Sequence, residues 1–424
     1  MPLRFSAKLL CLLLLNASVL AGDWPQWRGP LRNAQSDEKL SSHDWNAQPP
    51  QHLWTVEGFG AGYASLSIFD GVLYTVGNTE QGQAVIAAKA SDGSILWKSP
   101  VTDANPKHSY EGSRCTPSVA GDHLYVVTSD GSIACLARGD GKIVWQRKFS
   151  DWNGKMMSGW GFSESPLVDG DRVLCTPGGS DALVVCLDRM TGKDIWKCAA
   201  TFEGSAGKDG AGYSSIVTGE GLGIPQYVQL TGRGLIGINA KDGKQLWTYN
   251  RVANGVANIP TPIVEGNFVF GSTSYKTGAA LVELKRDGNK IIAEEKYFLE
   301  GNVFNNHHGG MILKDGYVYA GHQQNEGFPT CVRMSSGEIV WGGKLRGPGK
   351  GSAAVLLIDG HIIFRYQDGT VALIEATPDK YRLKGSFKPD YQEGATWAHP
   401  VVVAGRLYLR EQNKLMCYEV GSSR

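Results

Sequence analysis

The hydrophobic and polar positions of the chain follow one pattern that recurs along most of its length. Residues 182–197 contain an apolar run, a polar turn with Gly192, and a second run that ends in Trp196. Two short runs joined by a glycine turn predict a β-hairpin. The same pattern ends at Trp97, Trp145, Trp247 and Trp341. The pattern therefore predicts a repeat protein.

A small residue stands ten positions before each of these tryptophans and fixes the phase of the repeat. These residues are Ala87, Cys135, Cys186, Gly237 and Cys331. Two further copies, residues 281–292 and 370–381, keep the pattern without the tryptophan. An eighth copy is divided between the chain ends, because residues 414–420 supply one strand and residues 52–56, with Trp54, supply the other. This division predicts that the two ends pair and close a ring.

Each hairpin is preceded by another apolar run, glycine turn and apolar run, as in residues 165–175 and 261–270. Four-stranded sheets repeated at roughly forty to fifty residues are typical of β-propellers. We therefore expect an all-β fold in which residues 51–424 form one eight-bladed propeller of four-stranded blades. Pairing of the N- and C-terminal strands should close it.

The N-terminal residues 1–21 have the pattern of a secretory signal peptide. Arg4 and Lys8 precede the apolar run Leu9–Leu15, and small residues stand at the cleavage positions before Gly22. The run is shorter than the ~20 residues that span a bilayer, so no membrane span is predicted. The residues before Cys11 also lack the pattern for lipid attachment. We expect a periplasmic or secreted protein.

Residues 22–50 are polar and rich in proline, without a hydrophobic period. They predict an ordered N-terminal arm rather than a domain. Its first tryptophans, Trp24 and Trp27, are expected to pack on the outside of the propeller.

Composition and cysteine spacing exclude several classes of partner. Lys and Arg number 42 against 41 Asp and Glu, a net charge of +1, so the chain lacks the basic character that phosphate contacts require. No nucleic-acid partner is predicted. Without Cys11 the cysteines are odd in number, and none lies in a Cys-x-x-Cys pair. We expect neither a structural disulfide nor a cysteine metal site.

The hairpin Leu187–Trp196 and its copies resemble the repeat of pyrroloquinoline quinone (PQQ) propeller proteins, over residues 51–420. Residues 23–30, 160–179 and 306–313 further resemble a group of exported bacterial members. The family includes quinoprotein alcohol dehydrogenases and the non-catalytic outer-membrane assembly protein BamB. The resemblance implies a ligand- or protein-binding scaffold or, as the alternative, a PQQ-dependent dehydrogenase of alcohols or sugars that uses PQQ with Ca²⁺.

Departures from both subfamilies leave these alternatives open. The larger dehydrogenases carry adjacent cysteines and an aspartate beside the cofactor, whereas this chain has no adjacent cysteines and no aspartate at the start of a first strand. BamB is a lipoprotein, and the lipid-attachment pattern is missing here. The binding scaffold is the first hypothesis.

The loops that lead into the innermost strands of a propeller form one mouth of its channel. Here these mouth loops carry side chains that suit a small planar or sugar-like ligand, or an envelope protein. The candidate ligand- or cofactor-binding residues are Trp160, Ser163, Glu164, Tyr213, Asn258, His308, Lys350, Trp397 and His399. The candidate catalytic residues are His307, His308 and Glu164. Alternatively, these polar groups satisfy backbone groups and buried waters.

The adjacent histidines give little support for a metal site. His307 and His308 should point to opposite faces of an extended strand, so at most one should face the channel. No metal site is predicted.

Overall fold

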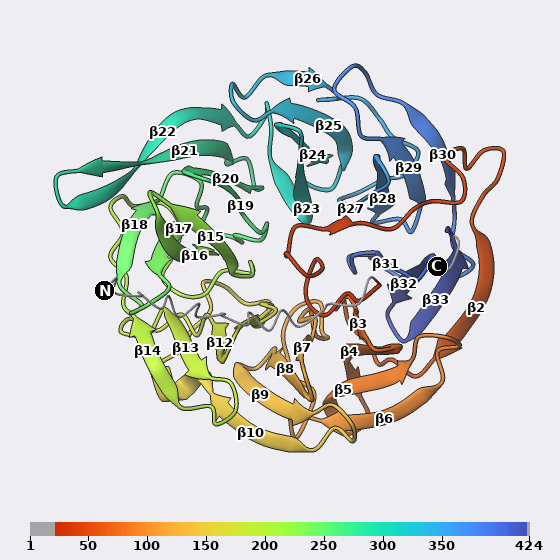
Figure 1. Cartoon of the computed structure of the whole chain (residues 1–424), viewed down its shortest axis with the longest axis horizontal. Helices are drawn as coiled ribbons and strands as arrows, with labels where there is room; N and C mark the ends of the chain where they lie inside the picture. The colour runs from red at the N-terminus through yellow and green to blue at the C-terminus, as the bar shows by residue number, and fades with distance from the viewer. Residues whose placement is uncertain (1–21, 422–424) are drawn as a thin grey trace, which may run out of the picture.

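The computed structural model describes residues 22–421, and the predicted signal peptide, residues 1–21, lies outside this range. Eight sheets surround a central channel, which confirms the eight-bladed, all-β prediction (Figure 1). In every blade the first strand lies nearest the channel and antiparallel neighbours follow outward. Within the described range, no helix is long and apolar enough to cross a membrane.

The blades are numbered along the chain. Blade 1 contains β3 (Ser67–Phe69), β4 (Val72–Thr79), β5 (Gly82–Lys89) and β6 (Ile95–Pro100). Blade 2 contains β7 (Ser118–Ala120), β8 (His123–Thr128), β9 (Ser132–Ala137) and β10 (Ile143–Lys148), followed by a short 3₁₀ helix, η1 (Phe149–Trp152). Blade 3 contains β11 (Leu167–Asp169), β12 (Arg172–Cys175), β13 (Val184–Asp188) and β14 (Asp194–Cys198). Blade 4 contains β15 (Val217–Gly221), β16 (Ile224–Thr231), β17 (Gly234–Asn239) and β18 (Gln245–Tyr249).

Blade 5 contains β19 (Ile263–Glu265), β20 (Phe268–Thr273), β21 (Gly278–Asp287) and β22 (Lys290–Glu300), and its outer hairpin projects beyond the ring (Figure 1). Blade 6 contains β23 (Asn306–Lys314), β24 (Tyr317–His322), β25 (Phe328–Arg333) and β26 (Ile339–Trp341). Blade 7 contains β27 (Ala353–Ile358), β28 (His361–Tyr366), β29 (Val371–Glu375) and β30 (Leu383–Phe387).

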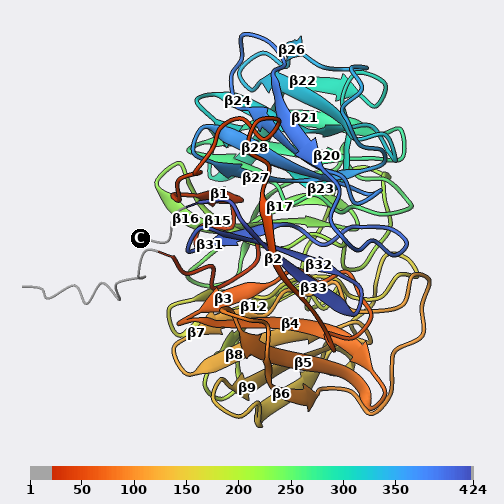
Figure 2. The ribbon, with the colours of Figure 1, turned by 90° about the vertical axis from the view of Figure 1, so that its right-hand side faces the viewer.

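The eighth blade joins the two ends of the propeller. It contains β31 (Val401–Val403), β32 (Arg406–Glu411), β33 (Lys414–Glu419) and β2 (Gln51–Glu57). Strand β2 is antiparallel to β33, with Trp54 opposite Cys417 and Val56 opposite Leu415. The side view shows β2 beside β33 (Figure 2). The predicted closure is confirmed.

The ten-residue spacing in the sequence corresponds to a cross-strand pair. Cys186 faces Trp196, and the same register pairs the other four small residues with their tryptophans. Trp145 also reaches the next blade, because its Nε1 donates to the Arg189 carbonyl at 2.9 Å. A Cβ on the turn residue Gly192 would lie 2.7 Å from the Trp145 ring, and its φ is +68°. Glycine is therefore required there by both backbone conformation and packing between blades.

The two copies without a tryptophan place other residues at this position. Tyr297 faces Leu281 in blade 5, and Gly385 faces Leu373 in blade 7; both lie beyond the predicted copies 281–292 and 370–381. The hydroxyl of Tyr297 donates to the Met334 carbonyl of blade 6 at 2.6 Å, so it still joins two blades. Next to Gly385, the buried Trp45 of the arm fills the free space.

Trp24 and Trp27 do not pack on the outside of the propeller, and that expectation is wrong; only the later part of the arm, with Trp45, lies beside the outer strand β30. Trp24 is buried and bridges to Ile68 of the innermost strand β3. Strand β1 (Gln35–Ser36) extends blade 7 by pairing in parallel with β27. Figure 1 shows the arm, in red, lying across the centre of the ring. The free edge of an innermost strand offers unpaired backbone groups, and the arm satisfies some of them.

The cysteines lie where a small buried side chain is needed. Cys135, Cys186, Cys331 and Cys417 each face the aromatic residue of their blade. All seven cysteines of residues 22–421 are buried, and none forms a disulfide in that range.

Candidate functional site

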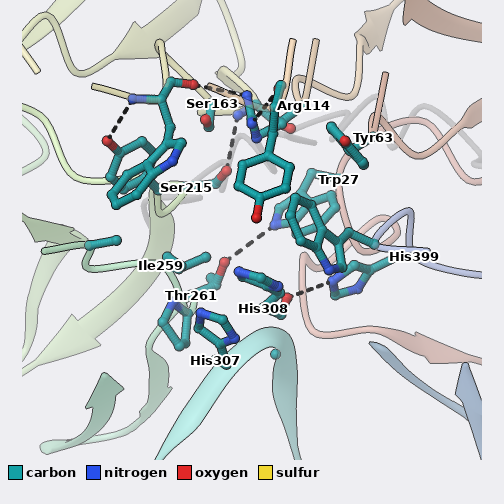
Figure 3. Close-up of a pocket in the computed structure, with 18 of the residues that line it drawn as sticks. Trp27, Tyr63, Arg114, Ser163, Ser215, Ile259, Thr261, His307, His308 and His399 are labelled. Atoms are coloured by element: carbon teal, nitrogen blue, oxygen red, sulfur yellow. Dashed lines mark hydrogen bonds between the residues drawn. The ribbon is translucent and has the colours of Figure 1, made fainter. Parts of the chain in front are cut away.

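One pocket of about 310 Å³ lies at the mouth of the channel, and Trp27 and Arg28 of the arm form part of its lining (Figure 3). Mouth loops of seven blades contribute side chains, and blade 7 contributes Gln367 from the turn between β28 and β29. The main lining residues are Trp27, Arg28, Tyr63, Tyr110, Arg114, Trp160, Ser163, Tyr213, Ser215, Thr261, Tyr275, His307, His308, Gln324, Asn325, Gln367, Trp397 and His399. The volume lies within the range of small-molecule sites.

Trp397 is the centre of the aromatic wall. Its ring centroid lies 4.7 Å from that of Tyr63, 5.0 Å from that of Tyr110 and 4.6 Å from that of His308. The indole Nε1 donates to the Gln367 Oε1 at 2.9 Å, which fixes the ring orientation. Trp397 is thereby held by blades 1, 2, 6 and 7 without being fully buried.

Both adjacent histidines line the pocket, so the expectation that at most one would face the channel is wrong. Their ring centroids are 3.5 Å apart. The pairing of β23 with β24 is irregular between Asn306 and Met311, and Gly310 has a φ of +73°. This irregularity ends the strict alternation of side chains that an ideal strand would impose. His307 bonds to the Ser352 hydroxyl at 2.8 Å and to the Tyr275 hydroxyl at 3.1 Å.

The arm supplies part of the pocket that sequence reasoning missed. Trp27 packs against His399 with ring centroids 4.5 Å apart, and its Nε1 donates to the Thr261 hydroxyl at 3.3 Å. Arg28 is buried beside it and donates to the carbonyls of Met311 and Asn33. These residues lie outside the repeat, so its phase could not predict their position. The only feature of the sequence that indicated them is the pair of tryptophans within residues 23–30.

Burial keeps the pocket histidines neutral, so the positive charge of the pocket comes from its arginines. It lowers the pKa of His307 to about 4 and, together with Arg28, that of His399 to about 3. Burial, with His307 and Arg114 nearby, also lowers the pKa of His308 well below its usual value. Burial lowers the pKa of Arg28 and of Arg114 to about 10, so both are protonated at neutral pH.

The structure brings six of the nine binding candidates together in the pocket, along with His307. These are Trp160, Ser163, Tyr213, His308, Trp397 and His399. The other three lie elsewhere. Asn258 is buried and donates to the carbonyls of Thr231 and Gly232, and Lys350 is exposed outside the pocket.

Glu164 lies behind the pocket wall, although it was a candidate for binding and catalysis. One carboxyl oxygen accepts from the Thr176 backbone N–H, and the other accepts from the Thr176 hydroxyl and the Gln229 amide, each at 3.0 Å. The side chain is buried, and burial raises its pKa to about 8. Its surroundings give it a structural role, because its oxygens already have partners within the protein.

The Glu164→Gln variant should lose a pH dependence of stability that the unmodified protein has. Between the unfolded pKa of 4.5 and the folded pKa of about 8, the folded state holds a proton that the unfolded state releases, so Glu164 makes stability fall as pH rises. The slope should approach about 1.4 kcal/mol per pH unit. Urea unfolding at pH 5, 6, 7 and 8 measures it.

The test compares the free energies of unfolding of the two proteins at each pH. The comparison is needed because the buried histidines, present in both, make stability rise with pH below their ordinary pKa. We expect the stability of the unmodified protein relative to Glu164→Gln to decrease from pH 5 to pH 8. A constant difference would show that Glu164 is ionised throughout.

Among residues 22–421, no cluster of three or more His, Cys, Asp or Glu side chains has a geometry suited to a metal ion. The polar groups of the pocket are neutral amides, hydroxyls and imidazoles with two guanidinium groups. Such a set can hydrogen-bond the edge of a ring whose faces stack on Trp and Tyr.

Comparison with known proteins places the chain in a family. A family model described as outer membrane protein assembly factor BamB matches residues 32–153 and 129–378, more than half of the chain. The chain belongs to this family of PQQ-like propellers. Outer membrane protein assembly factor BamB of Shewanella oneidensis is 26% identical over 123 residues, or 28% of this chain. The match spans about a quarter, 27%, of that relative's length.

Solved structures with the same fold carry different names. A europium-containing methanol dehydrogenase has a TM-score of 0.66 at 11% identity, covering 92% of this chain and 89% of that one. The quinohemoprotein alcohol dehydrogenase ADHIIG of Pseudomonas putida HK5 has a TM-score of 0.63 at 15% identity, covering 95% and 81%. The computationally designed protein Ika8 has a TM-score of 0.61 at 10% identity, covering 87% and 100%. This likeness supports the fold and selects no function.

Proposed function

We propose that this BamB-family propeller is an exported binding module that holds a small planar or sugar-like ring in the pocket at its channel mouth. One observation carries the proposal: seven tryptophan and tyrosine side chains and seven neutral Ser, Thr, Asn and Gln side chains face one cavity, held by all eight blades and the arm. Aromatic faces stack on rings, and the neutral groups bond to their polar edges.

An envelope location is part of the proposal. The basic and apolar pattern of residues 1–21 supports export, and membership of a family described by an outer-membrane assembly factor agrees with it. In that setting an envelope protein could present the ligand, because the pocket opens at the mouth of the channel.

A PQQ-dependent dehydrogenase is the second candidate. The aromatic walls with Arg28 and Arg114 suit PQQ, a flat quinone that carries carboxylates. Calcium does not fit, because it needs about six to eight oxygen ligands, usually with carboxylates. None of the pocket-lining residues in the described range is Asp or Glu, and Glu164 is engaged behind the wall. We therefore derive no reaction through a Ca²⁺–PQQ centre.

Binding is tested with the mature protein and a panel of quinones, saccharides and outer-membrane peptides, by calorimetry. A ring ligand should bind, and Trp397→Ala should weaken it by about tenfold. The control Trp54→Phe, on the outer strand β2, should leave affinity unchanged. Absence of any ring ligand, or equal binding by Trp397→Ala, would contradict the proposal. Dye reduction that requires both PQQ and Ca²⁺ would favour the second candidate.

A further inference from the structure

The pocket combines positive charge with neutral hydrogen-bonding groups, and this combination limits the chemical class of ligand that it can bind. We infer that the ligand is an acidic saccharide, a uronic-acid ring whose carboxylate lies beside Arg114. The inference rests on the proposed function, because it assumes that the pocket binds a ring. It adds a charge and a chemical class that the family membership does not supply.

The positive charge comes from guanidinium groups without acidic partners in the pocket. Arg28 and Arg114 both line the cavity, and none of the pocket-lining residues in the range 22–421 is Asp or Glu. The three lining histidines are neutral at pH 7, as their lowered pKa values require. Two positive charges therefore face a small cavity. A cationic ligand would be repelled there and an anionic one attracted.

Arg114 is positioned to receive the anion. Its terminal nitrogens donate to the Trp160 carbonyl at 2.9 Å and to the Tyr110 carbonyl at 2.7 Å, with longer bonds of 3.4 Å to the carbonyls of Gly112 and Ser109. The guanidinium also lies over the Tyr63 ring, 5.3 Å from its centroid. Carbonyl partners fix the orientation of the group but carry no net charge, so its positive charge is free to act on a ligand. Figure 3 shows Arg114 across the pocket from His307 and His308.

The same loop brings Tyr110 to the mouth. Tyr110 has a φ of +53°, a conformation that bulky residues rarely adopt, and its carbonyl accepts from Arg114. The residue is 57% exposed, and its ring lies against Trp397. The anion-binding group and part of the stacking wall are therefore coupled through one backbone carbonyl, which places the acid group of the ligand close to the stacked ring.

The neutral groups favour a saccharide over a flat apolar acid. The lining includes Ser163, Ser215, Thr261, Gln324, Asn325 and Gln367. Hydroxyl and amide groups both donate and accept, which matches the several hydroxyls on a sugar ring. Thr261 and Gln367 already accept from Trp27 and Trp397, but each keeps a donor that a sugar hydroxyl can satisfy. A flat aromatic acid would leave these donors unused, and donors left unpaired on binding cost affinity.

The inference is tested with matched ligands on the unmodified mature protein. Calorimetry compares trisaccharides of galacturonate and glucuronate with their methyl esters and with the neutral galactose and glucose trisaccharides. At least one acid should bind tenfold or more tightly than its own ester, and added salt should weaken that preference. This comparison needs no variant and does not depend on how a substitution folds.

Arg114 variants then assign the charge to its residue. Arg114→Gln should weaken acid binding at least tenfold and leave ester binding unchanged, while Arg114→Lys should retain part of the preference for the acid. As a control, Lys350→Gln removes an exposed charge outside the pocket and should change neither affinity. A preference for the acid that survives in Arg114→Gln would overturn the assignment to Arg114.

The remaining outcomes separate this inference from the proposed function. Equal binding of acid and ester would overturn the acidic class while a ring-binding pocket stands. Binding of PQQ alone, with no saccharide bound, would overturn the saccharide class. If no ring ligand in either panel binds, the proposed function and this inference fail together.

Discussion

A chain that begins at Gly58, and so lacks β2, should not fold cooperatively under conditions in which the mature protein is folded. Strand β2 is the fourth strand of blade 8 and pairs with β33 from Gln51 to Glu57. Its removal leaves the backbone groups of β33 unpaired and takes away Trp54, whose Nε1 donates to the Ser91 carbonyl of blade 1. The expected loss is on the order of 5–10 kcal/mol, comparable with the whole stability of a domain.

Circular dichroism and thermal unfolding measure this effect. A second chain that begins at Gln51 is the matched control, because it also lacks the arm but keeps β2. It should unfold in one cooperative transition at a lower temperature than the mature protein, since it lacks Trp24 and Trp45, two arm residues that are buried against the blades. If the two shortened chains melt alike, ring closure through β2 does not hold the propeller together.

The propeller could be predicted because its information is local and repeated. The ten-residue spacing from Cys186 to Trp196 spans one hairpin, so the sequence itself sets the register of the pair. The arm carries no such repeat. Its position depends on Arg32, which donates to the Ser165 and Pro166 carbonyls more than a hundred residues away. A contact of that kind leaves no periodic signal.

The same distinction explains the candidate site. Mouth loops could be located from the phase of the repeat, and this brought Trp160, Trp397 and His308 to one cavity. Which way a side chain points within a loop depends on tertiary partners. Glu164 turns toward Thr176 and Gln229, and the irregular β23 brings both adjacent histidines to the pocket. Neither outcome follows from spacing.

Trp247→Ala should cost about 3–5 kcal/mol of stability, because it deletes a large side chain from a packed interior. Trp247 is 2% exposed and faces Gly237, whose missing side chain leaves room for the indole. Its Nε1 donates to the Gln226 Oε1 at 2.7 Å, and the substitution would leave that buried oxygen without its donor. Urea unfolding measures the change, and binding by the folded fraction should be unaltered.

Trp397→Ala should have the opposite effect to Trp247→Ala: a small loss of stability and a large loss of ligand affinity. Its ring is half-buried in an open pocket, so truncation leaves a space that water can enter, and the stability loss should be about 1 kcal/mol. The tryptophan on the outer strand is therefore expected to act on folding, and the tryptophan in the pocket on ligand affinity. If Trp397→Ala proves as unstable as Trp247→Ala and the folded fraction binds ligand normally, the aromatic wall only stabilises the fold and the binding site lies elsewhere.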